Sequence, residues 1–323
     1  MEKVRWGIIG CGDVTEVKSG PAFKLIKNSE LVAVMRRNGA LAKDYAERHK
    51  VSKWYDNADS LINDPDVDAV YIATPPSSHK EYTIKTAEAG KPVYVEKPMA
   101  ASYAECSEMV DFCNQKNVKL FVAYYRRALP RFLKIKSLID GGAIGDICSV
   151  NIRFFQKPTK EDFASGNWRI NQEIAGCGYF CDLGSHMIDI IQFFVDEISL
   201  VNGQASNQGK RYKVEDTVAA SFIFSNGAAG TGLWCFNSFE NLDATEILGT
   251  EGKIIYSTFN TSPIVLNNGK NKREEYTIEN PKHIEQPLIQ TVVDEILGKG
   301  KCSSTGESGS RTNWAIDKIL RRI

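Results

Sequence analysis

From Val4 to Ala123, short apolar runs alternate with amphipathic stretches whose apolar positions repeat at helical spacing. Strands that alternate with helices in this way predict right-handed βαβ units and a doubly wound parallel sheet, which is an α/β architecture. The predicted strands are Val4–Ile9, Leu31–Met35, Ala69–Ala73, Pro92–Val95 and Leu120–Ala123, and the predicted helices are Gly39–His49, His79–Ala89 and Ser102–Lys116.

The pattern changes after about Tyr124, where longer alternating strands and Asn-Gly turns become frequent. We expect two domains, residues 1–124 and 125–323, the second an α+β domain with a large, open, mostly antiparallel sheet and helices on one face. Its predicted strands are Ile147–Phe155, Leu200–Ser206, Asp216–Phe224, Ala228–Phe236, Ala244–Leu248, Lys253–Ser257, Ile264–Leu266 and Glu275–Ile278, with hairpin turns at Ser225-Asn226-Gly227 and Asn267-Asn268-Gly269. Its predicted helices are Arg131–Asp140, Gly178–Val195, Ile284–Leu297 and Arg311–Arg322.

The amino-acid composition indicates which class of partner to expect. Hydrophobic residues make up 42% and charged residues 25% of the 323 residues, and 40 Lys+Arg balance 40 Asp+Glu. This balance gives no electrostatic reason to expect nucleic acid or an acidic membrane surface, so we expect a small-molecule partner. No apolar run approaches the ~18–20 residues that span a bilayer.

The cysteines and the start of the chain suggest a compartment. The first residues lead directly into an apolar strand, without a basic and apolar leader, so we expect a cytoplasmic protein. Eight cysteines are scattered along the chain without a C-x-x-C pair. We expect Cys177 and Cys181, four residues apart, to be two small buried thiols.

The first candidate for chemistry is a glycine-rich turn after the first strand, Gly10-Cys11-Gly12-Asp13-Val14-Thr15. Gly10 allows a tight turn, and Gly12 lets the backbone approach a pyrophosphate at the start of a helix. Thr15 replaces the third glycine of the usual fingerprint, which puts close packing of helix on strand in doubt. Because the turn lies inside a βαβ unit, the sequence predicts dinucleotide binding through residues Gly10 to Val14.

The end of the second strand distinguishes between dinucleotides. An NAD site usually has a carboxylate here for the ribose hydroxyls, but this chain has Arg36 and Arg37. Two guanidinium groups can bind a 2′-phosphate in bidentate fashion. We therefore expect NADP(H) to be preferred, with NAD(H) as the alternative cofactor; the other interpretation is an ordinary solvated basic turn.

Two further loops follow strands of the predicted parallel sheet and should lie near the cofactor, because ligands bind at the carboxyl ends of such strands. One loop holds Thr74, Pro75, Pro76 and His79, and the other holds Glu96, Lys97 and Pro98. A lysine fixed at the end of a buried strand can orient a substrate oxygen, stabilise negative charge on it, or move a proton. A surface salt bridge of Glu96 is the alternative interpretation.

These motifs resemble the glucose–fructose oxidoreductase/inositol dehydrogenase family, often written Gfo/Idh/MocA, over essentially the whole chain. The resemblance rests on Gly10-Cys11-Gly12, on Glu96-Lys97-Pro98, on Tyr124-Tyr125-Arg126-Arg127, and on Gly176-Cys177-Gly178-Tyr179-Phe180-Cys181-Asp182-Leu183-Gly184-Ser185-His186-Met187-Ile188-Asp189. It implies an NAD(P)-binding Rossmann domain and an oxidoreductase acting on a hydroxyl or carbonyl group of a sugar or polyol. It also implies that Lys97, Asp182 and His186 form the catalytic set, and Arg126 joins the predicted cofactor-binding residues.

Residue spacing gives independent support for that catalytic set. Asp182 and His186 are four apart, so we expect their side chains to share one face of a helix that continues to Asp189. His186 can take the hydroxyl proton as hydride leaves carbon, while Asp182 binds the substrate hydroxyl or holds the imidazole. A structural histidine and a metal site formed by Asp182, His186 and Asp189 are the alternatives. Together with Lys97 and the dinucleotide turn, proton transfer without a metal is preferred.

Weaker signals concern substrate and assembly. The candidate substrate-binding residues, besides Asp182, are Tyr125, Arg127, Trp168 and Arg169, since an aromatic face suits the C–H face of a sugar ring. The alternative for Trp168 and Arg169 is an indole covering the domain edge beside a solvated guanidinium. An open sheet needs a cover, so we expect a homodimer or homotetramer through the C-terminal sheet.

Two other functions remain open from the sequence. One is a non-catalytic NADP-binding regulator, which is disfavoured because it would need none of Lys97, Asp182 and His186. The other is a glycoside-cleaving enzyme that recycles a tightly held nicotinamide, as some relatives do.

Overall fold

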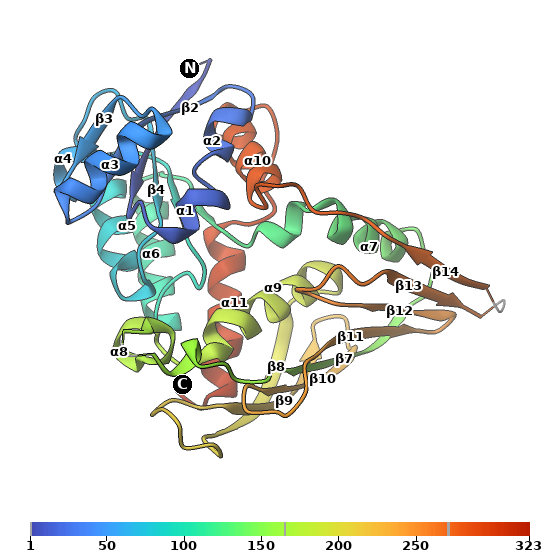
Figure 1. Ribbon diagram of the computed structural model, residues 1–323. Helices are drawn as coiled ribbons and strands as arrows, with labels where there is room; N and C mark the ends of the chain where they lie inside the picture. Colours follow the sequence, from blue (N-terminus) through green and yellow to red (C-terminus); the bar gives the residue numbers. More distant parts are fainter. Residues whose placement is uncertain (1, 165, 270–271) are drawn as a thin grey trace. The chain divides into compact units, whose positions relative to one another are not determined.

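The chain divides into two units in the computed structural model, which describes residues 2–164, 166–269 and 272–323 (Figure 1). Unit 1 comprises Met1–Leu129 and Pro281–Ser310, and unit 2 comprises Pro130–Asn280 and Arg311–Ile323. The boundary expected after Tyr124 lies close to the end of the first segment at Leu129. However, residues 281–310, which we expected in the C-terminal domain, group with unit 1 because α10 (Gln286–Ile296) packs against α2 (Ala22–Leu25) and η2 (Tyr125–Ala128).

Unit 1 contains a six-stranded sheet in the order β3-β2-β1-β4-β5-β6, with every pair parallel. The predicted α/β class and parallel sheet are confirmed. Its strands are β1 (Val4–Ile9), β2 (Ser29–Met35), β3 (Lys53–Tyr55), β4 (Ala69–Ile72), β5 (Val93–Val95) and β6 (Leu120–Val122). The sequence did not predict β3, which has three residues, none of them buried, and therefore lacks an apolar run.

Several helices flank this sheet. They are α1 (Asp13–Val17), α2, α3 (Gly39–His49), α4 (Ala58–Ile62), α5 (His79–Glu88), α6 (Tyr103–Gln115) and α10, with the 3-10 turns η1 (Pro76–Ser78) and η2. Helices α3, α5, α6 and α10 lie close to predicted positions, whereas α2 and α4 were not predicted. The Ser102 hydroxyl caps α6, since it accepts a hydrogen bond from the backbone N–H of Glu105. Helix α11 (Gly306–Ile319) begins in unit 1 and ends in unit 2.

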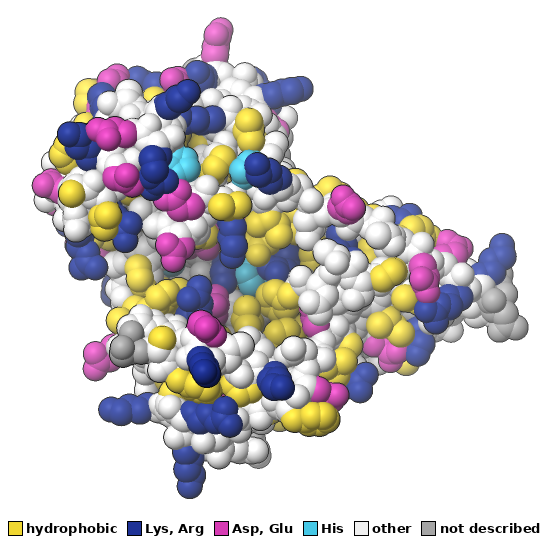
Figure 2. Space-filling view, in the orientation of Figure 1, with side chains coloured by type: hydrophobic (Ala, Val, Ile, Leu, Met, Phe, Trp, Pro, Cys, Tyr) yellow, Lys and Arg dark blue, Asp and Glu magenta, His cyan; other side chains and the backbone are white. Residues whose placement is uncertain are grey.

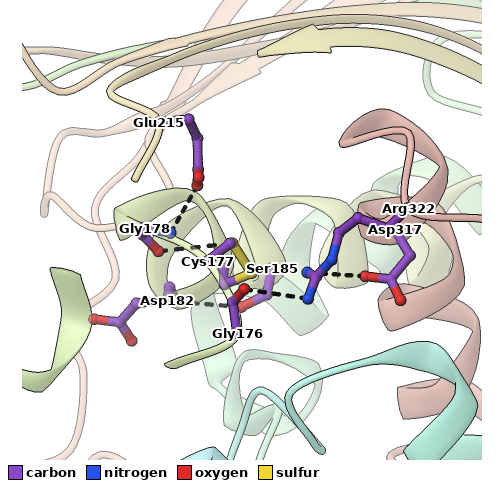
Figure 3. Close-up of a disulfide and its surroundings, with 9 residues drawn as sticks. Gly176, Cys177, Gly178, Asp182, Ser185, Glu215, Asp317 and Arg322 are labelled. Carbon is purple, nitrogen blue, oxygen red and sulfur yellow. Dashed lines mark hydrogen bonds and ion pairs between the residues drawn. A yellow bond between two sulfur atoms is a disulfide. The ribbon is translucent and has the colours of Figure 1, made fainter. Parts of the chain in front are cut away.

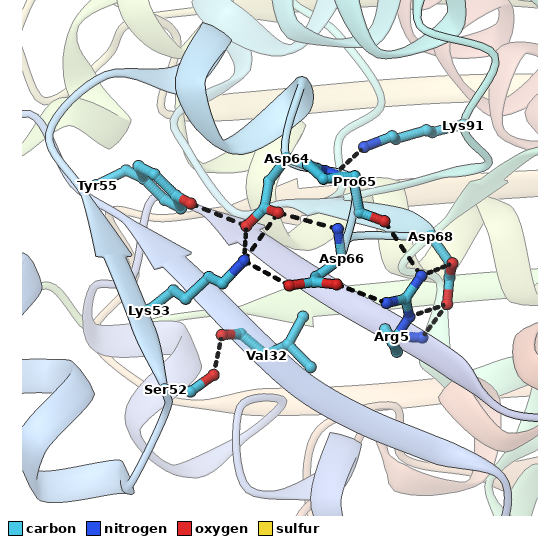
Figure 4. A network of polar contacts seen from close by, with 10 residues as sticks. All are labelled: Arg5, Val32, Ser52, Lys53, Tyr55, Asp64, Pro65, Asp66, Asp68 and Lys91. Atoms are coloured by element: carbon cyan, nitrogen blue, oxygen red, sulfur yellow. Dashed lines mark hydrogen bonds and ion pairs between the residues drawn. The ribbon is translucent and has the colours of Figure 1, made fainter.

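An ion network fixes the amino ends of the strands in unit 1 (Figure 4). Arg5 at the start of β1 binds Asp68, which precedes β4, with an Nη2–Oδ1 distance of 2.8 Å. Lys53 at the start of β3 donates to both oxygens of Asp64 at 2.9 Å, and the Tyr55 hydroxyl donates to the same carboxylate. Burial disfavours the charged form of Asp64, but these hydrogen bonds outweigh it and hold the pKa of Asp64 below its usual value. The network leaves the carboxyl ends of the strands for other contacts.

Unit 2 contains an eight-stranded sheet in the order β14-β13-β12-β11-β7-β10-β9-β8. Only the β7–β10 pair is parallel among these neighbours, which confirms the predicted mostly antiparallel sheet. Its strands are β7 (Ile147–Phe155), β8 (Ile198–Ser206), β9 (Thr217–Phe224), β10 (Ala229–Cys235), β11 (Leu242–Gly249), β12 (Gly252–Tyr256), β13 (Ile264–Asn268) and β14 (Lys272–Tyr276). The predicted turn at Asn267-Asn268-Gly269 directly precedes residues 270 and 271, which lie outside the described residues.

Helices cover one face of this second sheet. Helices α7 (Pro130–Asp140) and α9 (Ser185–Phe194) lie on the same side of it in Figure 1. The ring of Phe194 on α9 packs against Phe132 on α7 and Tyr256 on β12, at centroid distances of 6.3 and 5.7 Å. The remaining helical segments of unit 2 are η3 (Glu161–Phe163), η4 (Trp168–Ile170), α8 (Gln172–Ala175) and η5 (Phe180–Gly184).

The opposite face of the second sheet carries exposed apolar side chains. Leu200, Ile223, Ala229, Ser149 and Leu248 form one row across five neighbouring strands, because each is the registered partner of the next. Leu200 is 58% exposed and Leu248 is 41% exposed. The row therefore presents apolar surface that unit 2 itself leaves uncovered.

The remaining surface is mixed in charge. On the face that Figure 2 shows, Lys and Arg side chains are interspersed with Asp and Glu side chains. Among the described residues, no helix combines the length and the apolar character that crossing a bilayer requires.

Candidate active site

The glycine-rich turn after β1 has the geometry that a dinucleotide needs. Gly10 has a φ of +93°, and a Cβ there would lie 2.8 Å from the Thr74 side chain, so the turn after β1 packs tightly on the turn after β4. Gly12 differs, since a Cβ at Gly12 would meet only the Gly10 carbonyl oxygen, at 3.9 Å. The space beside Gly12 is thus open, as close approach of a pyrophosphate requires.

Thr15 resolves the doubt raised by the missing third glycine. It is fully buried, its hydroxyl donates to the Gly12 carbonyl at 2.7 Å, and its own carbonyl accepts from the Tyr45 hydroxyl at 2.8 Å. The close backbone contact is instead made at Gly20, because a Cβ there would lie 2.1 Å from the Thr15 carbonyl oxygen. Helix α1 is consequently only five residues long, shorter than the helix expected after this turn.

The basic pair at the end of β2 is exposed. Arg36 and Arg37 follow Met35, and Asn38 caps α3 by accepting from the Leu41 N–H. Within the described residues, neither guanidinium has a recorded ion pair. The Arg36 charge reaches the glycine-rich turn: burial raises the pKa of the Cys11 thiol to about 11, and Arg36 acts in the opposite direction. The two guanidinium groups are therefore available to an anion near this turn.

The loops after β4 and β5 are joined by a buried histidine. His79 is fully buried, with Nε2 2.6 Å from the Thr74 carbonyl oxygen and Nδ1 3.1 Å from the Pro98 carbonyl oxygen. Burial lowers the pKa of His79, against the effect of these carbonyls. Pro75 and Pro76 start the short η1 turn between Thr74 and His79. His79, predicted as a cofactor ligand, thus connects the two loops that face the cofactor side of the sheet.

Glu96 and Lys97 occupy different environments in the second of these loops. Glu96 is buried, accepts from the Tyr71 hydroxyl at 2.6 Å through Oε1, and accepts from the Lys97 N–H at 3.0 Å through Oε2. The sequence alternative of a surface salt bridge for Glu96 is therefore wrong. Lys97 is partly exposed and is followed by a cis peptide bond to Pro98. A buried carboxylate thus holds the backbone at the lysine.

The arginine-rich segment after β6 is buried within unit 1. Arg127, predicted to bind substrate, donates to the Ser303 carbonyl at 2.7 Å and so fixes η2 to the loop before α11. Arg126, predicted to bind cofactor, lies over the Tyr125 ring, 4.9 Å from its centroid. Both guanidinium groups are at most 7% exposed.

The segment of unit 2 that carries Asp182 and His186 is not a continuous α-helix. The predicted helix 178–195 consists of a π-helical turn, η5, followed by α9. Asp182 lies in the π turn and His186 lies in the first turn of α9, so the α-helical spacing that we assumed for this pair does not apply. Gly184 permits the turn, because a Cβ there would lie 2.5 Å from the Phe180 ring. Such π turns are frequent at functional sites.

A disulfide stands where we expected two thiols. Cys177 and Cys181 are bonded to each other, so the prediction of two separate buried thiols is wrong (Figure 3). The bend that carries Cys177, between α8 and η5, is the physical reason, since the two Cα atoms lie 5.7 Å apart across it, within the range of a disulfide. Figure 3 shows Asp182 projecting from the π turn, away from the disulfide. The other six cysteines are free, and Cys148 among them is exposed.

Two further side chains hold this segment, and the sequence did not indicate them. Glu215, which precedes β9, accepts from the Gly178 N–H at 2.8 Å, and burial raises the pKa of Glu215. Arg322, after α11, donates to the Gly176 carbonyl at 3.1 Å and pairs with Asp317 (Figure 3). The disulfide and these two contacts fix the backbone on both sides of Cys177.

His186 is 3% exposed and packs against an aromatic ring. The ring of Phe259 lies edge-on to the imidazole at a centroid distance of 6.0 Å. Asp243 accepts from the Thr258 and Phe259 N–H groups, which holds that turn beside His186. Asp189 is buried and accepts from the Thr312 hydroxyl at 3.4 Å. Within the described part of the chain, no group of three or more His, Cys, Asp or Glu side chains is arranged to hold a metal ion.

Arg169 links the candidate substrate loop to Asp182. Its Nε donates to Asp182 Oδ2 at 2.8 Å, and its guanidinium carbon lies 4.7 Å from the centroid of the Trp168 ring. The Arg169 side chain is nevertheless 43% exposed, so this ion pair does not exclude the alternative of a solvated guanidinium. Unit 2 brings together three of the predicted residues, Trp168, Arg169 and Asp182, in one cluster, whereas Lys97, Tyr125 and Arg127 belong to unit 1.

The disulfide yields a direct chemical prediction. Iodoacetamide added to denatured, unreduced protein should label six of the eight cysteines, and all eight should be labelled after reduction, as counted by mass spectrometry. In the Cys177→Ser variant, Cys181 should be labelled without reductant. Labelling of all eight cysteines in unreduced wild-type protein would contradict the pairing.

Comparisons with known proteins agree with this geometry. Residues 4–124 match the model of an oxidoreductase family with an NAD-binding Rossmann fold, and residues 132–255 match the GFO/IDH/MocA C-terminal domain. Oxidoreductase P35 of Formosa agariphila is 40% identical over 98% of both chains. Levoglucosan dehydrogenase of Pseudarthrobacter phenanthrenivorans is 32% identical, over 80% of this chain and 74% of its own length.

A solved structure supports the same relationship. A levoglucosan dehydrogenase in complex with NADH and levoglucosan superposes with a TM-score of 0.87 at 27% identity, covering 98% of this chain and 96% of that one. Together with the relatives and the domain matches, the turn after β1, the loop of Lys97 and the segment of His186 show that the chain belongs to the GFO/IDH/MocA family of oxidoreductases.

Proposed function

We propose that this oxidoreductase prefers NADP(H) and transfers a hydride between the nicotinamide and a hydroxyl or carbonyl carbon of a sugar, polyol or related cyclic compound. The observation that carries the proposal is the position of Lys97, directly after a buried strand of a dinucleotide-binding sheet. Relatives named for levoglucosan and for 1,5-anhydro-D-fructose support a cyclic sugar derivative as substrate.

Residues of unit 1 fit the cofactor. The open space beside Gly12 accommodates the pyrophosphate, and the residues Cys11, Asp13 and Val14 complete the turn. Thr74, Pro75, Pro76 and Glu96 would hold the nicotinamide part of the cofactor, and Arg36 and Arg37 would bind the 2′-phosphate. When bound, the nicotinamide supplies the acceptor or donor of the hydride.

The chain itself handles the proton. Lys97 orients the substrate oxygen and stabilises negative charge that develops on it. His186 removes the hydroxyl proton in the oxidation direction and returns it in the reduction direction. Asp182, held by Arg169, hydrogen-bonds the substrate and orients it toward His186. Trp168 offers its ring to the C–H face of the sugar, and Tyr125, beside Arg126, is a further substrate-binding residue.

Assembly and compartment complete the proposal. We infer a homodimer or homotetramer in which the exposed side chains of Leu200, Ile223 and Leu248 of one copy pack against those of another copy. We also infer a cytoplasmic location, which six free cysteines support, because oxidising compartments favour pairing.

The cofactor preference is tested by fluorescence titration of the protein with NADPH and NADH in parallel. Wild-type protein should bind NADPH at least about 10-fold more tightly, and Arg36→Ala should remove most of that difference, since a charge-assisted hydrogen bond contributes about 1.5–3 kcal/mol. Lys43→Ala is the control, because Lys43 is an exposed cation on α3 that pairs with Glu47. The proposal that Arg36 recognises the 2′-phosphate would be disproved if wild-type protein bound NADH more tightly than NADPH. It would also be disproved if Arg36→Ala lowered the affinity for both cofactors equally.

The proton-transfer roles are tested by steady-state kinetics on cyclic sugars and polyols. Lys97→Ala and His186→Ala should each lower kcat about 10²–10⁴-fold, which is the usual contribution of a positioned acid–base group, while cofactor affinity stays within a few-fold. Lys91→Ala is the matched control, since Lys91 lies at the other end of β5 and donates to the Asp64 carbonyl. Unchanged turnover would remove the substituted residue from the mechanism.

The assembly is tested by light scattering. Wild-type protein should have the mass of a dimer or tetramer, and Leu200→Arg together with Ile223→Arg should yield monomer with an unchanged circular dichroism spectrum, because charges would face each other across the sheets. A monomeric wild-type protein would contradict the proposed assembly.

A further inference from the structure

A second buried carboxyl lies next to Glu96, contributed by a distant part of the chain. Glu285 directly precedes α10 and is 1% exposed, and Glu96 follows β5 and is 7% exposed. Both belong to unit 1. The hydroxyl group of Tyr71 lies within 3.5 Å of an oxygen of each carboxyl group, which places the two side chains close together. The sequence motifs identified Glu96 but gave no indication of Glu285.

Two buried tyrosines supply hydrogen bonds to this pair from one side. The Tyr71 hydroxyl donates to Glu96 Oε1 at 2.6 Å and lies 3.5 Å from Glu285 Oε2, and the Tyr94 hydroxyl donates to Glu285 Oε2 at 3.2 Å. The two rings are stacked at a centroid distance of 4.9 Å, and both are fully buried. These contacts leave Oε1 of Glu285 buried, without a donor among the described residues.

A proton on Glu285 satisfies that oxygen. A buried polar atom without a partner is costly, and two adjacent buried carboxyl groups cannot both carry a charge. Burial, and then the neighbouring Glu96, raise the pKa of Glu285 well above its usual value, while Lys18 and the Tyr94 hydroxyl act in the opposite direction. Around the pair, the charge of Glu96 acts to raise the pKa of His79, and Cys302 acts to raise that of Tyr94. The buried, unpartnered oxygen of Glu285 is therefore the place where a proton would be held.

The second oxygen of Glu96 accepts from the backbone N–H of Lys97. Through the Tyr71 hydroxyl, which lies beside both carboxyl groups, Tyr94 and Glu285 are thus connected with Glu96 and with the backbone at Lys97. Since Lys97 is partly exposed at the end of a three-residue strand, the carboxylate of Glu96 restrains the position from which its side chain extends. The orientation of Glu96 in turn depends on its contact with Glu285.

We propose that Glu285 is a positioning residue for Lys97, acting through a proton that its carboxyl group shares with Glu96. The proposal rests on the function proposed above for Lys97. It predicts that the side chain at position 285 must carry a hydrogen-bond donor and must be long enough to reach Glu96. A glutamine can supply that donor through its amide, and a methionine of similar length cannot.

The first measurement uses the protein alone and is independent of its activity. Infrared spectroscopy at neutral pH should show the C=O stretch of a protonated carboxyl group in wild-type protein, and Glu285→Gln should remove it. The control is Glu295→Gln, because Glu295 lies on the same helix but accepts from the Cys302 N–H instead. Absence of the band in wild type, or its persistence in Glu285→Gln, would overturn the shared proton even if the enzyme were active.

The second measurement compares the variants kinetically. Glu285→Gln should keep kcat within about 3-fold of wild type, whereas Glu285→Met should lower kcat about 10-fold or more, an effect of about 1.4 kcal/mol, with a smaller change in the Kd of the cofactor. Circular dichroism and thermal unfolding establish that both variants fold. Equal kcat values for Gln and Met variants would overturn the positioning role. An inactive wild-type protein with the infrared band present would instead refute the proposed function and, with it, the role at Lys97.

Discussion

Unit 1 depends on hydrogen bonds to the polar backbone groups at the buried ends of β4 and β5. The sheet strands are completely buried, so the loops that follow them must find hydrogen-bond partners inside the protein. The two ring nitrogens of His79 lie next to the carbonyl oxygens of Thr74 and Pro98, and a neutral imidazole donates to one of them; Glu96 accepts from the N–H of Lys97. One consequence is that Lys97 extends from a backbone that is held on both sides.

The same requirement explains why a carboxyl pair is tolerated in this interior. Removing Tyr71 and Tyr94 from water is favourable for their rings but leaves two hydroxyl groups that need acceptors. Glu96 and Glu285 accept from them, and burial raises the pKa of both tyrosines well above the usual value, so they remain donors. The aromatic stack and the carboxyl pair are therefore mutually dependent.

In unit 2, backbone geometry rather than charge sets the site. The π turn at Phe180–Gly184 carries Asp182, which pairs with Arg169, and the bend before this turn brings Cys177 within bonding distance of Cys181. Glu215 and Arg322 hold the backbone on either side, and Phe259 packs on the imidazole of His186. Each of these partners comes from a different segment of the chain, and together they hold a non-standard helical turn that local sequence would not maintain.

The sequence by itself determined the parallel sheet, the large mixed sheet, the glycine-rich turn and the family motifs around Lys97 and His186, because these depend on periodicity and on neighbouring residues. Only the tertiary structure decided the return of residues 281–310 to unit 1, the π turn and its disulfide, and the burial of Arg127 and Glu96. The same holds for the partnership of Glu96 with Glu285. These features depend on which distant segments pack together, and the burial that such packing creates determines whether a side chain is charged, protonated or bonded.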